Sequence, residues 1–291
     1  MAVPKLSIVT CCKGRLEHLK RALPTFVEQV ESEVIVVDYD CPDRTQDWVR
    51  AHFPGVRVTT VSDTPILNIS RARNLGARAA RATWLAFCDA DQLLAPSFSL
   101  DLQPWMVPGT YVRTLRNTPS GPVRRPVPLV CEAETFWVVG GYDDAISGWG
   151  FEDRELIERL DRSGIRDALG AQLFVETLPH GNALRSSYYE HGIDVSAVIN
   201  HHYGTIKRRY FETRGHWFTD SQRHSTYRAV ERAVLAALAE PGSDAIFDIR
   251  IADSDPSWTA RLTARAIREF HKIRTEIDVR RENWQSVRLS E

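Results

Sequence analysis

Two carboxylates separated by one residue, Asp89 and Asp91, directly follow the apolar run TWLAFC at residues 83–88. Carboxylates at the end of a strand can face one ligand together, and such hard oxygen ligands suit Mg²⁺ or Mn²⁺ bridging a diphosphate. The Asp-x-Asp pattern alone is typical of a solvated turn, and it recurs at residues 38–40 and 253–255. The position of Asp89 and Asp91 after a buried strand makes them the candidate acids for a ligand site.

Other polar side chains follow or flank neighbouring predicted strands. Asp38 ends the β-branched run EVIVVD, where an acid can accept hydrogen bonds from the base or ribose of a nucleoside. Arg71, Arg73 and Asn74 stand near the start of a predicted helix, where arginine suits a diphosphate. The alternative interpretations are an acid that caps a turn and a solvated helical face.

A Gly-Trp-Gly loop containing Trp149 precedes two acids, Glu152 and Asp153, at the start of a predicted helix. Acids in the first turn complement the helix dipole by roughly 0.3–1 kcal/mol, which explains the acids but not the loop. A Trp beside a carboxylate can hold the face of a sugar while the carboxylate accepts a hydroxyl proton. The segment is therefore a candidate acceptor and general-base site.

His180 follows the apolar run LFVETL at residues 173–178. A single histidine is usually a surface residue or a satisfied core residue. At a strand exit, however, it can complete the ligand set of a metal at Asp91. His201 and His202 are competing candidates, although neither has a matching strand before it.

The elements that would position these residues alternate along the first half of the chain. Strands are predicted at 5–10, 33–38, 56–61 and 83–88, and helices at 15–30, 44–53 and 69–82, the last with Ser70 as a candidate cap. This order predicts an α/β fold with a mostly parallel sheet, which binds ligands at the carboxyl ends of its strands. Beyond it, the sequence predicts an irregular proline-rich loop at 117–128, strands at 135–139 and 173–178, and helices at 223–239 and 257–281.

Length and composition limit the classes of protein. The 291 residues are 43% apolar and 26% charged, which is typical of a globular chain, and a net charge of -1 provides no general attraction for nucleic acid or anionic membrane. Five cysteines without a CxxC pair argue against a zinc ribbon and a disulfide framework. The N-terminal residues lack a signal-peptide pattern, and no run approaches the roughly 20 apolar residues of a membrane span. We expect a reduced, soluble, cytoplasmic protein.

Five segments together resemble glycosyltransferases of the GT-A fold, specifically the family 2-like group with a galactosyltransferase-type C-terminal motif. They are LSIVTCCKGRLEHLKRAL, VIVVDYDCPDRT, SRARNLGARAARATWLAFCDADQLL, FWVVGGYDDAISGWGFEDRELIERLDRSG and GAQLFVETLPH. The resemblance implies a Rossmann-like GT-A domain over residues 1–200, with a nucleotide-sugar half (1–95) and an acceptor half (96–200). A helical C-terminal extension would follow over residues 201–291.

The resemblance also implies a role for each candidate residue. Donor binding falls to Thr10, Asp38 at the uracil or ribose, Arg73 at the diphosphate, and Asp89 at the ribose or donor sugar. Mn²⁺ or Mg²⁺ is held by Asp91 and His180, the acceptor by Trp149 and Glu152, and Asp153 is the general base, with Glu152 as its catalytic neighbour. The sequence departs from the family where Tyr39 intervenes before Asp40, and where CCKGR replaces the commoner proline-aromatic-asparagine loop.

The implied activity is metal-dependent transfer of a sugar from a nucleotide sugar, a UDP-sugar, to an acceptor hydroxyl. A cation stabilises the charge on the departing diphosphate, and a carboxylate base on the opposite face gives a single in-line displacement with inversion.

Several alternatives remain. One is a non-catalytic scaffold that binds nucleotide sugar. Another, a nucleotidyltransferase, is disfavoured because CCKGR holds one glycine. The acceptor is open between a glycan, a small molecule, a protein and a modified nucleic-acid base. The last is suggested by basic and aromatic residues interleaved at 207–218, although a helix with buried aromatic residues is the simpler interpretation of that segment.

Overall fold

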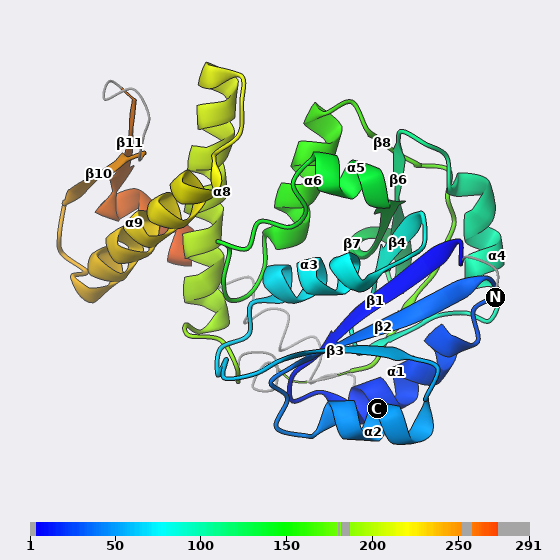
Figure 1. The fold of residues 1–291 in the computed structure, drawn as a ribbon. Coiled ribbons are helices and arrows are strands. Elements are labelled where there is room, and N and C mark those ends of the chain that lie inside the picture. Colours follow the sequence, from blue (N-terminus) through cyan, green and yellow to red (C-terminus); the bar gives the residue numbers. More distant parts are fainter. Residues whose placement is uncertain (1–3, 180, 182–186, 252–257, 273–291) are drawn as a thin grey trace. The chain divides into compact units, whose positions relative to one another are not determined.

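The chain forms two compact units (Figure 1). The computed structural model describes residues 4–179, 181, 187–251 and 258–272. Unit 1 comprises Met1–Asp144 and Glu152–Tyr188, and unit 2 comprises Ala145–Phe151 and Tyr189–Glu291. The short segment Ala145–Phe151 therefore groups with the C-terminal part of the chain, which no pattern in the sequence indicates.

The N-terminal part of unit 1 is a parallel sheet with helices between its strands, as predicted. The strands are β1 (Leu6–Cys12), β2 (Ser32–Tyr39), β3 (Arg57–Val61) and β4 (Trp84–Phe87), and the helices are α1 (Leu16–Val27), α2 (Thr45–His52) and α3 (Ile69–Ala79). They run in the order β3-β2-β1-β4, the blue and cyan strands of Figure 1. The cap of α3 is Asn68, whose side chain accepts a hydrogen bond from the amide of Arg71, and not the predicted Ser70.

The sheet continues with an antiparallel hairpin where the sequence predicts an irregular loop. Strands β6 (Thr110–Thr118), β7 (Gly121–Glu132) and β8 (Arg166–Asp167) extend it in the order β4-β7-β6-β8. The predicted loop over 117–128 is wrong for a physical reason. Pro122 and Pro126 lie before Leu129, where the pairing of β7 with β4 begins, and proline is tolerated where a strand lacks a neighbour on one side.

Two further strand predictions fail. Residues 135–139 lie mostly in helix α5 (Ala133–Val138), where buried Phe136 packs 5.0 Å from Phe87 between ring centroids, so tertiary packing overrides β-propensity. Within 173–178, only β9 (Glu176–Thr177) is a strand, and it pairs with β5 (Gln92–Leu93) in a separate two-stranded sheet. The other helices in the described part of unit 1 are α4 (Phe98–Leu102), η1 (Gln103–Trp105) and α6 (Glu152–Arg162).

The large sheet of unit 1 has an apolar cluster on each face. Successive residues of a strand point to opposite faces, and accordingly Ile8 of β1 joins the cluster that contains Phe26 of α1, whereas Val9 joins the cluster that contains Phe87. Gly76 lets α3 approach β1 closely, because a Cβ atom there would lie 2.3 Å from Cγ1 of Val9. Packing on both faces thus fixes the position of the sheet.

Unit 2 is built on two long helices. It contains α8 (Ile193–Arg214), α9 (Asp220–Ala239), β10 (Ile246–Arg250) and β11 (Thr259–Thr263). The domain boundary predicted at residue 200 falls inside α8. The predicted helix at 223–239 is confirmed as part of α9. The prediction at 257–281 is wrong over β11, which pairs antiparallel with β10; residues 264–272 are helical, and 273–281 lie outside the described residues.

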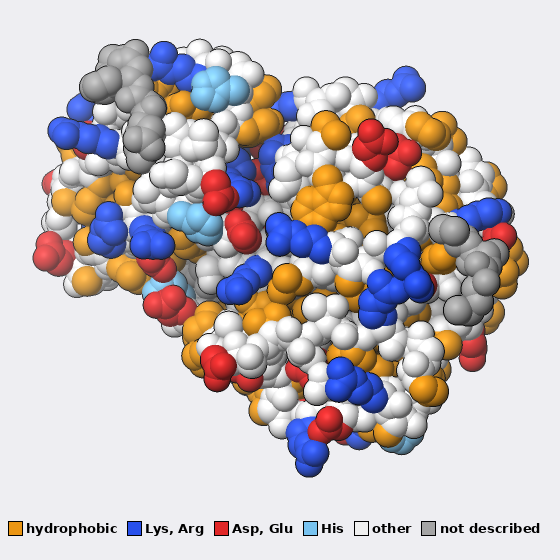
Figure 2. All heavy atoms as spheres, in the orientation of Figure 1, with side chains coloured by type: hydrophobic (Ala, Val, Ile, Leu, Met, Phe, Trp, Pro, Cys, Tyr) orange, Lys and Arg blue, Asp and Glu red, His pale blue; other side chains and the backbone are white. Residues whose placement is uncertain are grey.

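No helix in the described part of the chain is long and apolar enough to cross a membrane. On the face drawn in Figure 2, basic and acidic side chains are interspersed. This distribution agrees with the net charge of -1 and gives that face no general electrostatic preference for a polyanion.

Candidate active site

Three parallel strands of unit 1 bring polar residues to one edge of the sheet. Cys12 at the end of β1 pairs in register with Asp38 of β2, and Asp89 follows β4, which pairs with β1 on its other side. The carboxyl ends of parallel strands form the ligand-binding edge in sheets of this kind. This edge carries the residues predicted to bind the nucleotide.

A buried arginine gathers three of the predicted site acids. Nη2 of Arg73 lies 2.9 Å from Oδ1 of Asp89. Nη1 of the same side chain lies 2.7 Å from Oδ1 of Asp153 and 3.3 Å from Oε1 of Glu152. The Arg73 side chain is only 5% exposed, and its Cζ lies 5.0 Å from the ring centroid of Tyr142. Residues that the sequence assigns to donor and acceptor binding therefore surround one cation.

Asn74 and Gly141 fix the turn that contains Tyr142. The side chain of Asn74 donates to the carbonyl of Tyr142 (2.8 Å) and accepts from its amide (2.9 Å). Gly141 has φ of +65°, and a Cβ atom there would lie 2.8 Å from Oδ1 of Asn74, so the turn requires glycine. The hydroxyl of the seated Tyr142 donates to Oδ1 of Asp153 (3.1 Å). Tyr142 is a site residue that no pattern in the sequence indicates.

Burial shapes the protonation of the two acids. Burial, reinforced by the charge of Asp153, raises the pKa of Glu152 to about 8 despite the opposing effect of Arg73. Burial also raises the pKa of Asp153, while Arg73 and Tyr142 act against it. Oε2 of Glu152 is buried and has no hydrogen-bond partner among the described residues. These pKa shifts favour a protonated Glu152 beside an ionised Asp153, because two neighbouring buried acids avoid carrying two charges. Asp153 is then a carboxylate that can accept a proton.

Asp38 is buried, and both of its carboxylate oxygens accept backbone amides. Cys41 donates to Oδ1 (2.9 Å) and Gln46 to Oδ2 (2.6 Å). Each carboxylate oxygen can accept a second hydrogen bond, so anchoring this loop is compatible with a nucleoside contact, which stays a prediction. Asp40 has φ of +50° and accepts the amide of Thr64 (3.1 Å), which places it in a loop-anchoring role.

The described residues fit a divalent metal at Asp91. Asp89 and Asp91 supply the hard oxygen ligands that Mg²⁺ and Mn²⁺ prefer. Asp91 is 8% exposed, and Nη1 of Arg15 lies 3.7 Å from its Oδ2. The amide of Leu178 donates to the carbonyl of Asp91 (2.7 Å), so the chain passes beside Asp91 two residues before His180. His180 itself lies outside the described residues.

Two family models match the segments that carry the predicted donor and acceptor residues. Residues 7–117 match the family Glycosyl transferase family 2, and residues 128–191 match the family described as the N-terminal domain of galactosyltransferase. Two curated relatives are validoxylamine A glucosyltransferases of Streptomyces hygroscopicus, from the subspecies jinggangensis and limoneus. Each is 25% identical over 61% of this chain, covering 56% and 52% of the relatives. The chain thus spans about half the length of the curated relatives it matches.

Solved structures share the fold. A mannosyltransferase from Pyrobaculum calidifontis in complex with GDP-Man and Mn²⁺ is 18% identical, with a TM-score of 0.53 over 84% of this chain and 77% of that one. S. aureus TarS in complex with UDP-GlcNAc is 12% identical, with a TM-score of 0.52 over 79% and 73%. GalNAc-T7 with UDP, GalNAc and Mn²⁺ is 15% identical, with a TM-score of 0.52 over 79% and 55%. Unit 1 has the GT-A fold of these glycosyltransferases. The resemblance found in the sequence and the predicted fold class are both confirmed.

Two residues of the first strand and the loop after it belong to the part of unit 1 that is predicted to bind the nucleotide. Thr10 of β1 is buried, and its Oγ1 has no hydrogen-bond partner in the part of the chain that the structure describes. Lys13 is a residue that the sequence analysis missed. Its Nζ donates to the carbonyls of Tyr39 (3.1 Å), Asp40 (2.8 Å) and Thr64 (2.9 Å), which ties the first loop to the end of β2. Its one signal is its place in CCKGR, where the sequence departs from the family.

The Gly-Trp-Gly loop groups with unit 2, where two buried side chains hold it. Nδ2 of Asn200 lies 3.0, 3.3 and 2.8 Å from the carbonyls of Ser147, Trp149 and Gly150. The hydroxyl of Tyr227 lies 2.9 Å from Oδ1 of Asn200 and 3.1 Å from the carbonyl of Ser147. Trp149 itself is half-buried. Asn200 and Tyr227 carry no pattern in the sequence that could have found them.

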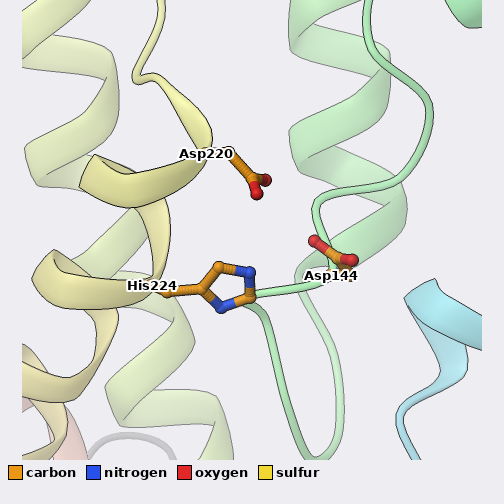
Figure 3. A group of neighbouring side chains, drawn as sticks. All are labelled: Asp144, Asp220 and His224. Carbon is orange, nitrogen blue, oxygen red and sulfur yellow. The ribbon is translucent and has the colours of Figure 1, made fainter.

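The histidines proposed as alternative metal ligands also lie in unit 2. His201 stacks on Phe270 with ring centroids 4.0 Å apart. His202 is buried together with its Nε2, and burial lowers its pKa to about 4, which favours a neutral core histidine. Figure 3 shows two further polar residues of this unit, Asp220 and His224, on the first turns of α9. Among the described residues, no group of three potential metal ligands includes Asp91, His201 or His202.

Proposed function

We propose that the chain transfers a sugar from a UDP-sugar to an acceptor hydroxyl, with inversion and with the help of a divalent metal. The observation that supports this proposal best is the convergence of Asp89, Glu152 and Asp153 on buried Arg73. It joins the nucleotide edge of the sheet to the candidate base at the start of α6. A domain that only binds nucleotide sugar has no need of a buried carboxylate pair beside that edge.

Asp153 accepts the proton of the acceptor hydroxyl in this proposal. Arg73 and Tyr142 both contact Oδ1 of Asp153, which orients the carboxylate for a hydroxyl at its other oxygen. Glu152, with its raised pKa, keeps the proton of the pair at neutral pH, so that Asp153 is the charged member. Because the base and the leaving group act on opposite faces of the sugar, one displacement inverts the anomeric carbon.

Arg73 acts as a positioning residue. Its guanidinium already contacts three carboxylates, and a planar fork of five N–H donors suits this task better than an ammonium group. Its predicted contact with the diphosphate stays a prediction. Asp91 and His180 would hold a Mn²⁺ or Mg²⁺ ion, whose charge would stabilise the departing diphosphate. Asp38 and Lys13 fix the loops that border the nucleoside.

The acceptor remains the open part of the proposal. Trp149 and Glu152 are its candidate contacts, and the acceptor class is a glycan, a small molecule, a protein or a modified nucleic-acid base. In the segment 207–218, Lys207, Tyr210 and Phe218 are buried, which supports the simpler interpretation of that segment as a helix with buried aromatic residues. Two of the similar solved structures contain UDP or UDP-GlcNAc and one contains GDP-Man, so nucleotide choice needs direct measurement.

A screen of donors tests the proposal. Binding and hydrolysis of UDP-, GDP- and dTDP-sugars are measured for the full chain with Mn²⁺, with Mg²⁺ and with EDTA. We expect metal-stimulated hydrolysis that is fastest with a UDP-sugar. Tight binding of nucleotide sugar without turnover of any donor would favour the scaffold alternative instead.

A further inference from the structure

Two cysteines meet at the nucleoside edge of the glycosyltransferase domain. Cys12 is the last residue of β1, and Cys41 follows the end of β2. Their Sγ atoms lie 3.9 Å apart as free thiols. Oγ1 of Thr45 lies 3.2 Å from the Cys12 sulfur and 3.1 Å from the Cys41 sulfur, and the amide of Gly14 donates to the Cys41 sulfur at 3.1 Å. One sulfur thus sits among hydrogen-bond donors beside a second thiol.

The two thiols differ in reactivity. Cys41 is half-buried, and hydrogen bonds to its sulfur, first of all from Cys12, lower its pKa to about 6. Cys12 is fully buried, and its hydrogen bond to Cys41 together with burial raises its pKa. A thiolate is the nucleophilic form of cysteine, so Cys41 is the attacking residue and Cys12 the resolving one. Burial raises the pKa of Cys11 and of Cys131 to about 12, which leaves them poorly reactive.

We propose that Cys41 and Cys12 are a peroxide-responsive thiol pair, which closes into a disulfide and thereby weakens nucleotide binding. The second half of this inference rests on the proposed function. The Cys41 thiolate attacks the peroxide O–O bond, forms an S–O bond and releases hydroxide, which takes up a proton to become water. The Cys12 thiol then attacks the sulfenic sulfur, forms the S–S bond and releases a second water. Two thiols are oxidised and one hydrogen peroxide is reduced to two waters.

Disulfide closure must disturb the loops at this edge. A disulfide joins its sulfur atoms at about 2.05 Å, so the pair must close a gap that is now 3.9 Å. At least one sulfur must move, and both now have hydrogen bonds with Thr45, while the Cys41 sulfur also accepts the amide of Gly14. The backbone amide of Cys41 also donates to Oδ1 of Asp38, the predicted nucleoside contact. We therefore expect the oxidised chain to bind UDP at least ten-fold more weakly than the reduced chain.

The first experiment detects the bond without any donor. The full-length chain is treated with hydrogen peroxide, its free thiols are counted, and its disulfide-linked peptides are identified by mass. We expect loss of two thiols and a Cys12–Cys41 link that a thiol reductant reverses. Cys41→Ser and Cys12→Ser should each abolish the link, whereas the neighbouring control Cys11→Ser should retain it. A link through Cys11, or oxidation of Cys41 beyond the sulfenic acid with no link, would overturn the proposal.

The second experiment measures UDP affinity by calorimetry before and after peroxide. The expected ten-fold loss should be absent in Cys12→Ser and should be reversed by reductant in the natural chain. A complete Cys12–Cys41 link with unchanged UDP affinity overturns the regulatory half of the proposal. If the reduced chain binds no UDP, the proposed function fails, while the peptide masses still decide whether the thiol pair exists.

Discussion

The buried side chain of Arg73 organises the candidate active site at the scale of single residues. Three carboxylates within 3.3 Å of one guanidinium would repel one another without it. The shared cation holds Asp153 in one orientation, and burial pushes the pKa of Glu152 upward until it retains a proton. The chemistry proposed for the pair follows from this division of charge.

Replacing Arg73 by Lys keeps the charge but removes the fork that reaches three carboxylates. We expect Arg73→Lys to lose about 1–3 kcal/mol of unfolding free energy, because buried charged hydrogen bonds are left unmade. Urea unfolding at pH 7 measures this loss. Arg71→Lys, on the same helix but exposed, is the matched control and should be nearly neutral. Equal stability of the two variants would show that the cluster does not depend on the guanidinium.

The raised pKa of Glu152 predicts a pH dependence of stability. The folded chain binds this proton up to about pH 8, whereas an unfolded glutamate loses it near its ordinary value of 4.5. Between these values the folded state binds more protons, so the unfolding free energy falls as pH rises. Glu152→Gln cannot lose a proton there, so its stability relative to the natural chain should increase by at least about 1 kcal/mol from pH 5 to pH 8, given 1.36 kcal/mol per pKa unit. Denaturation curves measure both proteins at each pH. The same stability difference between Glu152→Gln and the natural chain at pH 5 and at pH 8 would contradict the prediction.

At the scale of elements, the sequence predicts the strands and helices of residues 5–88 because their periodicity and packing agree. Strands β1, β2 and β4 are largely buried, and α1 buries one apolar face. These elements suffice to place Asp38, Arg73, Asp89 and Asp91 at one sheet edge.

Prediction from the sequence fails where tertiary contacts determine the local structure. Prolines in β7 are tolerated because that part of the strand has one neighbour, and the β-branched segment around Phe136 is helical because that ring is needed in the core. The site residues Tyr142, Lys13 and Asn200 were missed for a related reason. Lys13 and Asn200 donate to backbone carbonyls distant in sequence, and Tyr142 is placed by the side chain of Asn74, which is distant in sequence as well. Such contacts leave no local pattern.

The clamp of Asn200 on the Gly-Trp-Gly loop predicts a local loss of protection. Asn200→Ala removes the Nδ2 donor that three carbonyls of residues 147–150 share, although the Ser147 carbonyl still accepts from the hydroxyl of Tyr227. We expect hydrogen exchange in residues 145–151 to accelerate by ten-fold or more, with a stability loss of about 1–3 kcal/mol for the unsatisfied groups. Glu212→Ala, at an exposed position of the same helix, is the control. Unchanged exchange in the loop would mean that other contacts hold Trp149.

At the scale of the whole molecule, a unit with the GT-A fold and a second, largely helical unit share one chain. Residues 145–151 leave unit 1 and return to it at Glu152, so the predicted acceptor loop and the predicted base come from different units. The acids predicted to act in catalysis lie in unit 1, where they share Arg73.

The proposed metal dependence is tested on the whole chain. Asp91→Ala and His180→Ala should each abolish metal-stimulated turnover of a nucleotide sugar, because each removes a proposed ligand. Turnover is followed as nucleotide release across a titration of Mn²⁺. Full activity in EDTA would refute the metal role. If Asp91→Ala loses activity and His180→Ala does not, Asp91 is a metal ligand and His180 is not.

The central claim is that Asp153 is the base of a sugar transfer, and one variant tests it most directly. Asp153→Asn keeps the shape of the side chain but cannot accept a proton. Transfer rate, UDP affinity and melting temperature are measured together, with Glu152→Gln as the matched control. We expect UDP affinity and folding to persist while transfer falls by about 10²–10⁴-fold in Asp153→Asn, and by less than about ten-fold in Glu152→Gln. Nearly unchanged transfer in Asp153→Asn, or a collapse confined to Glu152→Gln, would contradict the account.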